Sequence, residues 1–254
     1  MNKLLATAIT AATLSMAAHP AFAEEVRESR AVDAKVTRVK LGGVADLTVR
    51  QGATASLVVY GERDQVSKLT TSQHGDTLQI DTNKNESRVG WGRNELKAEL
   101  TVPNLAEFVS HGVGGSRIIG FSGDTLKLSL DGAGSVTIDS RYRNLDARLG
   151  GVGGLTLNGI DAERVDLSLR GAGRISATGQ AKVLHAKLAG VGSLEAAKLR
   201  ADSVDLDLSG LGGAEVFAKS AASLNLSGMG SATVYGNPAT RTSNSSGMGR
   251  VQWK

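Results

Sequence analysis

Four acidic or imidazole side chains recur at equivalent positions of a repeat and could carry acid–base chemistry. They lie five residues before a Gly-x-Gly motif in four successive repeats: Asp146, Asp166, His185 and Asp205. Carboxylates stacked beside basic residues such as Arg148 and Lys187 can serve as a general acid and a general base in the cleavage of a polysaccharide. The same pattern is typical of a solvated strand face with alternating charges, and the sequence favours this second interpretation.

Other catalytic and cofactor chemistries are not expected. A nucleotide-binding Gly-x-Gly-x-x-Gly precedes a helix, whereas this motif recurs eight times without a helical pattern after it. Calcium-binding glycine repeats carry Asp two residues after the second glycine. The corresponding residues here are Val136, Leu155, Ile175 and Leu194. Cys is absent, and His74, His111 and His185 are far apart in sequence, so we expect no metal, no cofactor and no enzyme.

A second column of the repeat is apolar and occupies the position between the two glycines. Its members are Val113, Ala133, Val152, Ala172, Val191, Leu211, Met229 and Met248. If the motif forms a corner, these side chains point into the core, and the sequence favours this arrangement. If the strand runs straight through the motif, they form an exposed stripe that would mark a partner surface. The candidate residues of such a stripe are Val152, Val191, Leu211, Met229 and Met248.

The repeat itself predicts the elements that position both columns. The first glycine of each motif recurs every 18 to 20 residues, at Gly112, Gly132, Gly151, Gly171, Gly190, Gly210, Gly228 and Gly247. Leu stands two residues before most of these glycines and alternates with polar residues, which indicates a half-buried strand. A second short strand follows the glycines, and a turn-rich third side closes the coil. The connections are too short for helical crossovers, so the coils must stack as a parallel all-β solenoid.

The two ends of the repeat are less regular. Ser110 and Ser245 replace Leu in the first and last repeats, which predicts polar caps on the open ends of the solenoid. Residues 33–103 lack the glycine period but contain five strand patterns: Val36–Leu41, Val44–Val49, Ser56–Tyr60, Thr77–Asp81 and Leu96–Val102. We interpret them as irregular opening coils and a cap on the same core. Asn83–Asn94 is predicted to be a long polar loop.

The order of these pieces resembles a known family. Val44–Gly52 and Ser56–Gly61 are followed by Gly75–Ile80, by Leu100–Leu105 and then by the Gly-x-Gly ladder. This order resembles the GIN-domain family, which is often labelled an autotransporter adhesin head. The resemblance implies a right-handed parallel β-helix, an exported location and a largely uncharacterised function. No translocator barrel follows the ladder, so we do not expect an autotransporter in the strict sense.

The N-terminus and the composition indicate export. Residues 1–23 are typical of a signal peptide, with Lys3, an apolar stretch and the cleavage pattern Ala21-Phe22-Ala23. Residues 24–254 would then form one domain, with opening coils at 33–103 and regular coils at 104–254, in the periplasm or at the cell surface. The remaining chain has no apolar run long enough for a membrane span. A net charge of +4 is too weak to indicate nucleic-acid binding.

Taken together, these patterns favour a protein that acts by binding, as an adhesin-like module of the bacterial envelope or surface. Its partner would be a glycan or a protein surface, and a homo-oligomer is compatible with the pattern. A β-helical enzyme acting on envelope or extracellular polysaccharide is the first alternative. A purely structural spacer is the second.

Overall fold

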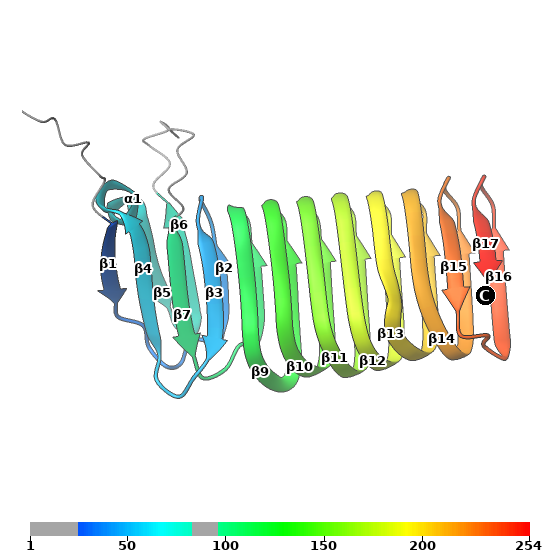
Figure 1. Cartoon of the computed structure of the whole chain (residues 1–254), viewed down its shortest axis with the longest axis horizontal. Coiled ribbons are helices and arrows are strands. Elements are labelled where there is room, and N and C mark those ends of the chain that lie inside the picture. Colours follow the sequence, from blue (N-terminus) through cyan, green and yellow to red (C-terminus); the bar gives the residue numbers. More distant parts are fainter. Residues whose placement is uncertain (1–24, 83–95) are drawn as a thin grey trace, which may run out of the picture.

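The computed structural model describes residues 25–82 and 96–254. The expected signal peptide and the expected loop Asn83–Asn94 lie outside these residues. The described chain forms a flattened rod in which 17 strands belong to one continuous sheet, and most of this sheet is wound as a parallel solenoid (Figure 1). The prediction of an all-β solenoid is therefore confirmed.

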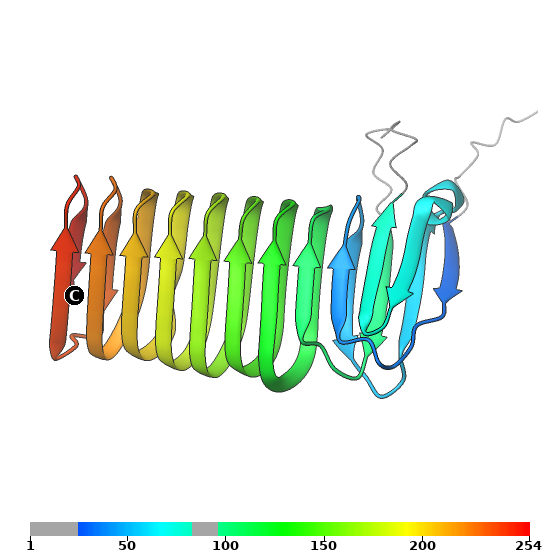
Figure 2. The same ribbon diagram turned by 180° about the vertical axis from the view of Figure 1, so that it is seen from behind.

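Six long strands make the regular part of the rod. They are β9 (Val113–Leu130), β10 (Ala133–Leu149), β11 (Val152–Leu169), β12 (Ala172–Leu188), β13 (Val191–Leu208) and β14 (Leu211–Leu226). Each runs along one broad face, turns through a rounded bend and returns along the other face (Figure 2). The predicted turn-rich third side is wrong, because the bend stays paired with its neighbours, as Asp161 with Gln180. The coil is thus one curved strand with a single break at the Gly-x-Gly corner.

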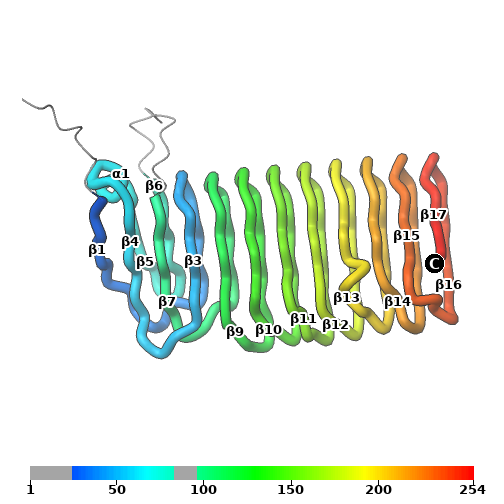
Figure 3. Tube along the Cα trace, viewed as in Figure 1, coloured from blue at the N-terminus to red at the C-terminus, as the bar shows by residue number. Residues whose placement is uncertain are grey.

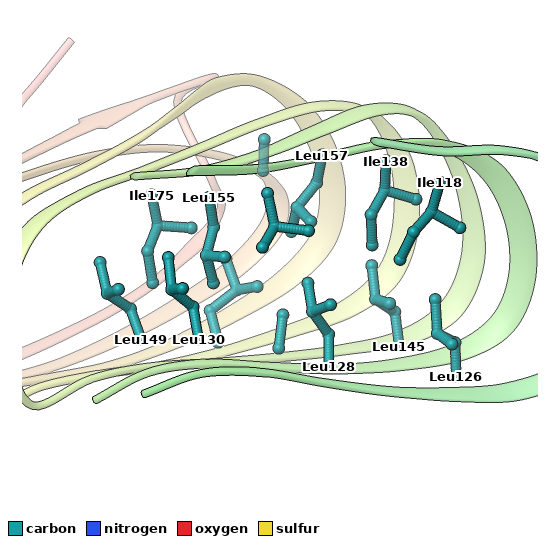
Figure 4. Close-up of a cluster of buried hydrophobic side chains, with 14 of the residues drawn as sticks. Ile118, Leu126, Leu128, Leu130, Ile138, Leu145, Leu149, Leu155, Leu157 and Ile175 are labelled. Carbon is teal, nitrogen blue, oxygen red and sulfur yellow. The ribbon is translucent and has the colours of Figure 1, made fainter. Parts of the chain in front are cut away.

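The core lies between the two broad faces. Successive coils pair in parallel with like residues opposite each other, as Leu149 with Leu169 and Leu169 with Leu188. Figure 4 shows side chains of one face, such as Ile138 and Leu157, pointing toward those of the other face, such as Leu128 and Leu145. All these side chains are buried. Alternation along each strand thus places one set of side chains in the core and the other in solvent.

The corner glycines are required because the backbones of adjacent coils approach closely there. A Cβ on Gly151 would overlap the carbonyl oxygen of Gly132, and a Cβ on Gly153 would overlap that of Gly134. Gly153 also has a φ of +143°, a conformation that residues with a side chain rarely adopt. Close approach of the backbones therefore requires glycine at both positions, and the positive φ requires it at Gly153 as well.

The opening coils are stacked in a different order from the sequence. The strands β2 (Arg38–Leu41) and β3 (Asp46–Gln51) form the first coil of the chain. This coil lies between the coil of β6 (Thr77–Thr82) and β7 (Lys97–Val102) and that of β8 (Glu107–Ser110) and β9. The strands expected in this region are present, with bounds shifted by up to two residues. One consequence is that Ser110 is buried between Leu41 and Leu130, so it does not cap an end, contrary to our expectation.

The two ends of the rod differ. At the N-terminal end, β1 (Glu25–Arg30) and β4 (Ser56–Glu62) pair antiparallel, as do β5 (Leu69–His74) and β6, and a short helix α1 (Arg63–Lys68) joins β4 to β5. At the other end, β15 (Ser231–Tyr235), β16 (Thr240–Ser245) and β17 (Arg250–Trp253) complete the last coils. Ser245 continues the column of Leu226 and is exposed, which agrees with a polar cap at this end. None of the described helices has the length and apolar character of a membrane span.

Candidate binding surfaces

The charged column is formed as the repeat predicted. Parallel pairing places Asp146 opposite Asp166, Asp166 opposite His185, and His185 opposite Asp205. The carboxylates are already in contact with neighbouring side chains. The Arg148 guanidinium donates two hydrogen bonds to Asp146, the shorter at 2.8 Å, and the Nδ1 of His185 lies 3.4 Å from an oxygen of Asp205.

Asp166 is held in the same way by Arg164, whose guanidinium donates hydrogen bonds of 2.7 and 2.9 Å. These bonds, together with the negative charge of Asp166, raise the pKa of the Arg164 guanidinium. Arg164 was not predicted from the sequence, although it stands two residues before Asp166 and therefore on the same strand face. The side chains of Asp146 and Asp166 are 28% and 36% exposed, so the column lies on an open face of paired charges. No cluster of three or more metal-binding side chains occurs among residues 25–82 and 96–254.

The apolar column is exposed, and the interpretation that it belongs to the core is wrong. Val152 is 62% exposed, Val191 56%, Leu211 46%, Met229 58% and Met248 80%. The motif does form a corner. However, the side chain between the two glycines lies at the outer apex of the bend, because the two flanking glycines carry the close approach to the adjacent coil. The position inside the corner is thus filled by backbone, and the side chain points to solvent.

The exposed residues form one line, which we call the apolar stripe. Its nine members are Val44, Val113, Ala133, Val152, Ala172, Val191, Leu211, Met229 and Met248. Val44 was missed because its coil has Ala45 in place of the second glycine. The stripe follows the broken upper edge of the rod in Figure 1. Eight steps of the strand spacing give it a length of about 38 Å.

A shallow groove runs beside the stripe. Its floor is the first-glycine column Gly171, Gly190, Gly210 and Gly228, and its volume is about 540 Å³. Three glycines of this floor donate backbone hydrogen bonds to a neighbouring coil: Gly171 to the Leu149 carbonyl, Gly190 to the Leu169 carbonyl and Gly210 to the Leu188 carbonyl. At these positions the groove offers glycine backbone with paired N–H groups beside the side chains of Val191 and Leu211. Such a surface accepts apolar groups without leaving a buried donor unpaired.

Small uncharged residues flank the C-terminal half of the stripe. The residues two positions before and after Val191, Leu211 and Met229 are Ala189, Ser193, Ser209, Gly213, Ser227 and Ser231. Charged residues flank other members of the stripe. Arg170 and Arg174 stand on either side of Ala172, and Arg250 follows Met248, whereas Asp46 and Asp131 flank Val44 and Ala133. Arg174 pairs with Glu195 at 3.0 Å. Arg170 has no ion-pair partner within the part of the chain that the structure describes.

A second groove, of about 690 Å³, crosses five coils on the rounded bend and was not predicted from the sequence. We call it the bend groove. The rounded bends that line it form the lower edge of the rod in Figure 1, opposite the edge where the long strands begin and end. Near it β13 contains a bulge: Ala196 pairs with Val216, and the next paired residue, Arg200, pairs with Phe217, which directly follows Val216. The tube in Figure 3 shows the resulting kink in β13. Such bulges reorient side chains and are common near functional sites.

The walls of the bend groove are polar. Glu163 accepts a hydrogen bond of 3.1 Å from Lys182 and lies 3.5 Å from Arg143. This hydrogen bond, and then the charges of Lys182 and Arg143, lower the pKa of Glu163. On the other wall, Gln180 donates to Asp161 at 2.9 Å. These residues gave no periodic signal in the sequence. The bend lies far from the glycine motif, and the residue types at equivalent positions of the bend differ from coil to coil.

Comparison with solved structures shows the fold. A putative adhesin from Bacteroides fragilis is 20% identical, with a TM-score of 0.69, over 91% of this chain and 97% of that chain. A putative adhesin from Parabacteroides merdae is 16% identical, with a TM-score of 0.80, over 91% and 96%. A putative lipid binding protein from Parabacteroides distasonis is 18% identical, with a TM-score of 0.77, over 89% and 96%. The comparison with curated proteins gave no match.

The family is shown by the sequence itself. The model of the family described as "Putative auto-transporter adhesin, head GIN domain" matches residues 35–238, which include the opening coils and nearly all of the Gly-x-Gly ladder. The resemblance noted from the order of the motifs is therefore confirmed, and the chain belongs to the GIN-domain family of adhesin heads.

Proposed function

We propose that this protein is an exported, non-enzymatic binding module that attaches to an anionic lipid surface through the apolar stripe. The observation that carries the proposal is the contiguous line of exposed Val, Leu and Met side chains. Among residues 25–82 and 96–254, all the large hydrophobic side chains that are exposed belong to this line. Exposed apolar residues are ordinary when they are scattered, whereas a continuous set marks an interaction surface.

The surroundings of the stripe favour lipid. The small residues beside Val191, Leu211 and Met229 let these side chains reach the acyl region without bringing charges with them. Each half-exposed side chain would contribute about 1 kcal/mol on burial. Arg170 and Arg250 would contact headgroup phosphates, adding about 1 kcal/mol each. The name of the Parabacteroides distasonis neighbour, a putative lipid binding protein, and the adhesin label of the family both agree with attachment to a surface.

A second copy of the chain fits the stripe less well. If two copies packed antiparallel along the whole stripe, the two-fold axis of the dimer would pass through Ala172, the central residue of the stripe. Arg170 and Arg174 flank Ala172, so the pair would bring the arginines of both copies together. Like charges opposed in an interface are unfavourable. An enzyme acting on polysaccharide is also less favoured, because the carboxylates of Asp146 and Asp166 are bound by arginines on an open face.

Vesicle cosedimentation tests the proposal. We expect the protein to bind vesicles of phosphatidylcholine with phosphatidylglycerol more strongly than vesicles of phosphatidylcholine alone. The double variant Leu211→Ser/Met229→Ser should lose at least about tenfold in affinity. The exchange Leu211→Met/Met229→Leu keeps the apolar area and should bind as the wild type does. Equal binding by the serine variant, or a dimer in solution that the serine variant dissociates without any vesicle binding, would refute the proposal.

A further inference from the structure

We propose that the bend groove is a second binding site, which takes an extended, polyhydroxylated chain such as a neutral glycan. The groove is a separate surface from the stripe, on the opposite edge of the rod (Figure 1). No residue of it belongs to the charged column considered above. A protein fixed to a lipid surface by one edge would present this groove to the solution on the other.

The shape of the groove follows from the convex bend. Outward side chains at alternate positions diverge where the strand curves, so a hollow opens between two neighbouring columns of the ladder. The floor between them is the backbone of Ala162, Ala181 and Ala201, whose side chains point inward and are buried. In the preceding coil, Tyr142 occupies the equivalent inward position. Asn144 pairs with Arg164, and Tyr142 and Ala162 each stand two residues before a member of this pair. The hollow continues across coils because like positions stack in register, and it therefore suits an elongated ligand.

The charges along the groove alternate in sign. One wall carries Arg143, Glu163, Lys182, Asp202 and Lys219 in successive coils, with an ion pair of 3.7 Å between Lys219 and Asp202. The other wall carries Asp161, Gln180, Arg200 and Phe217. Four cations and three anions nearly cancel, so the groove lacks the one-signed field that a polyanion or a polycation needs.

This arrangement matches the chemistry of sugar hydroxyls. A hydroxyl group both donates and accepts hydrogen bonds, so it can be satisfied by carboxylates and by ammonium or guanidinium groups in turn. Exposed ion pairs such as Glu163–Lys182 contribute little to stability, and their exchange for ligand hydrogen bonds costs correspondingly little. At one end of the groove the Arg200 guanidinium lies over the Phe217 ring, 5.1 Å from its centre, so the ring holds a further hydrogen-bond donor in place for a sugar hydroxyl.

Binding of neutral oligosaccharides by the purified protein, without lipid, tests the inference. The probes are hexasaccharides of glucose and of N-acetylglucosamine, measured by calorimetry, with heparin as a polyanion. The variant Asp161→Ala/Gln180→Ala removes one hydrogen-bonded pair of the wall and should weaken binding at least about tenfold. The matched variant Asp146→Ala/Arg148→Ala removes a similar pair from the broad face and should keep binding within about twofold.

The absence of binding to any neutral hexasaccharide, or equal losses in the two variants, would overturn the inference. Salt-sensitive binding of heparin alone would also overturn it, because that result assigns the groove to polyanions. The measurement uses no vesicles and leaves the stripe intact, so its failure would not affect the lipid proposal. Failure of vesicle binding would likewise leave the glycan measurement valid.

Discussion

Gly153 packs so closely against the preceding coil that a Cβ at this position would overlap the carbonyl oxygen of Gly134. The next residue along the chain, Gly154, differs sharply, because its Cβ would have the Arg174 carbonyl oxygen as its nearest neighbour, at 3.7 Å. The close contact is thus confined to the two glycines of the corner, Gly151 and Gly153. The residue between them, Val152, can carry a side chain, and this side chain must point outward, which explains the stripe.

The corner predicts opposite outcomes for two adjacent substitutions. Gly153→Ala places a methyl group against backbone at a positive φ and should lower the free energy of unfolding by at least about 2 kcal/mol. Gly154→Ala meets only ordinary van der Waals contact and should change it by less than about 0.5 kcal/mol. Urea denaturation of both variants measures the difference. Similar values for the two would show that the glycines are not required by close approach.

A buried tyrosine links the regular coils to the opening segment. The Tyr142 hydroxyl donates a hydrogen bond of 2.7 Å to the Leu105 carbonyl. Tyr142→Phe leaves this carbonyl without that donor and should cost about 1–2 kcal/mol. Tyr60→Phe, which removes an exposed hydrogen bond of 3.2 Å to Glu99, is the matched control and should cost less than about 0.5 kcal/mol. Equal costs in thermal denaturation would contradict this assignment.

The same residue predicts a dependence of stability on alkaline pH. Burial raises the pKa of Tyr142 in the folded protein. Above the unfolded pKa of about 10, the unfolded chain therefore loses a proton that the folded protein retains, and stability falls as the pH rises. Denaturation between about pH 9 and 11 should show a steeper loss for the wild type than for Tyr142→Phe. Parallel curves would mean that Tyr142 does not retain its proton in the fold.

The charged column should be dispensable for binding. Asp166→Asn weakens the charge-assisted bonds from Arg164 on an exposed face, where such pairs contribute little. We expect vesicle and oligosaccharide affinities to stay within about twofold of the wild type. A loss of about a hundredfold or more in a variant that is still folded would restore the enzyme interpretation for this column.

The sequence predicted the fold well because its signals were periodic. The glycine spacing determines the length of a coil. The Leu column determines the register between coils, because equivalent residues stack in parallel strands. The charged column followed from the same period. The orientation of Val152 and its equivalents could not be predicted, because alternation fails at a corner where glycines change the backbone direction. The stacking order of β2 and β3 and the bend groove were also beyond the sequence, since both depend on contacts between distant residues without a repeated pattern.

Attachment through the apolar stripe can be followed with a single labelled residue, because the chain has no cysteine. An environment-sensitive fluorophore on Val191→Cys would report the stripe, and the same label on Lys187→Cys would report the broad polar face. With anionic vesicles we expect a blue shift of the emission at residue 191 and none at residue 187. Equal shifts at both positions, or vesicle binding without a shift at residue 191, would contradict it.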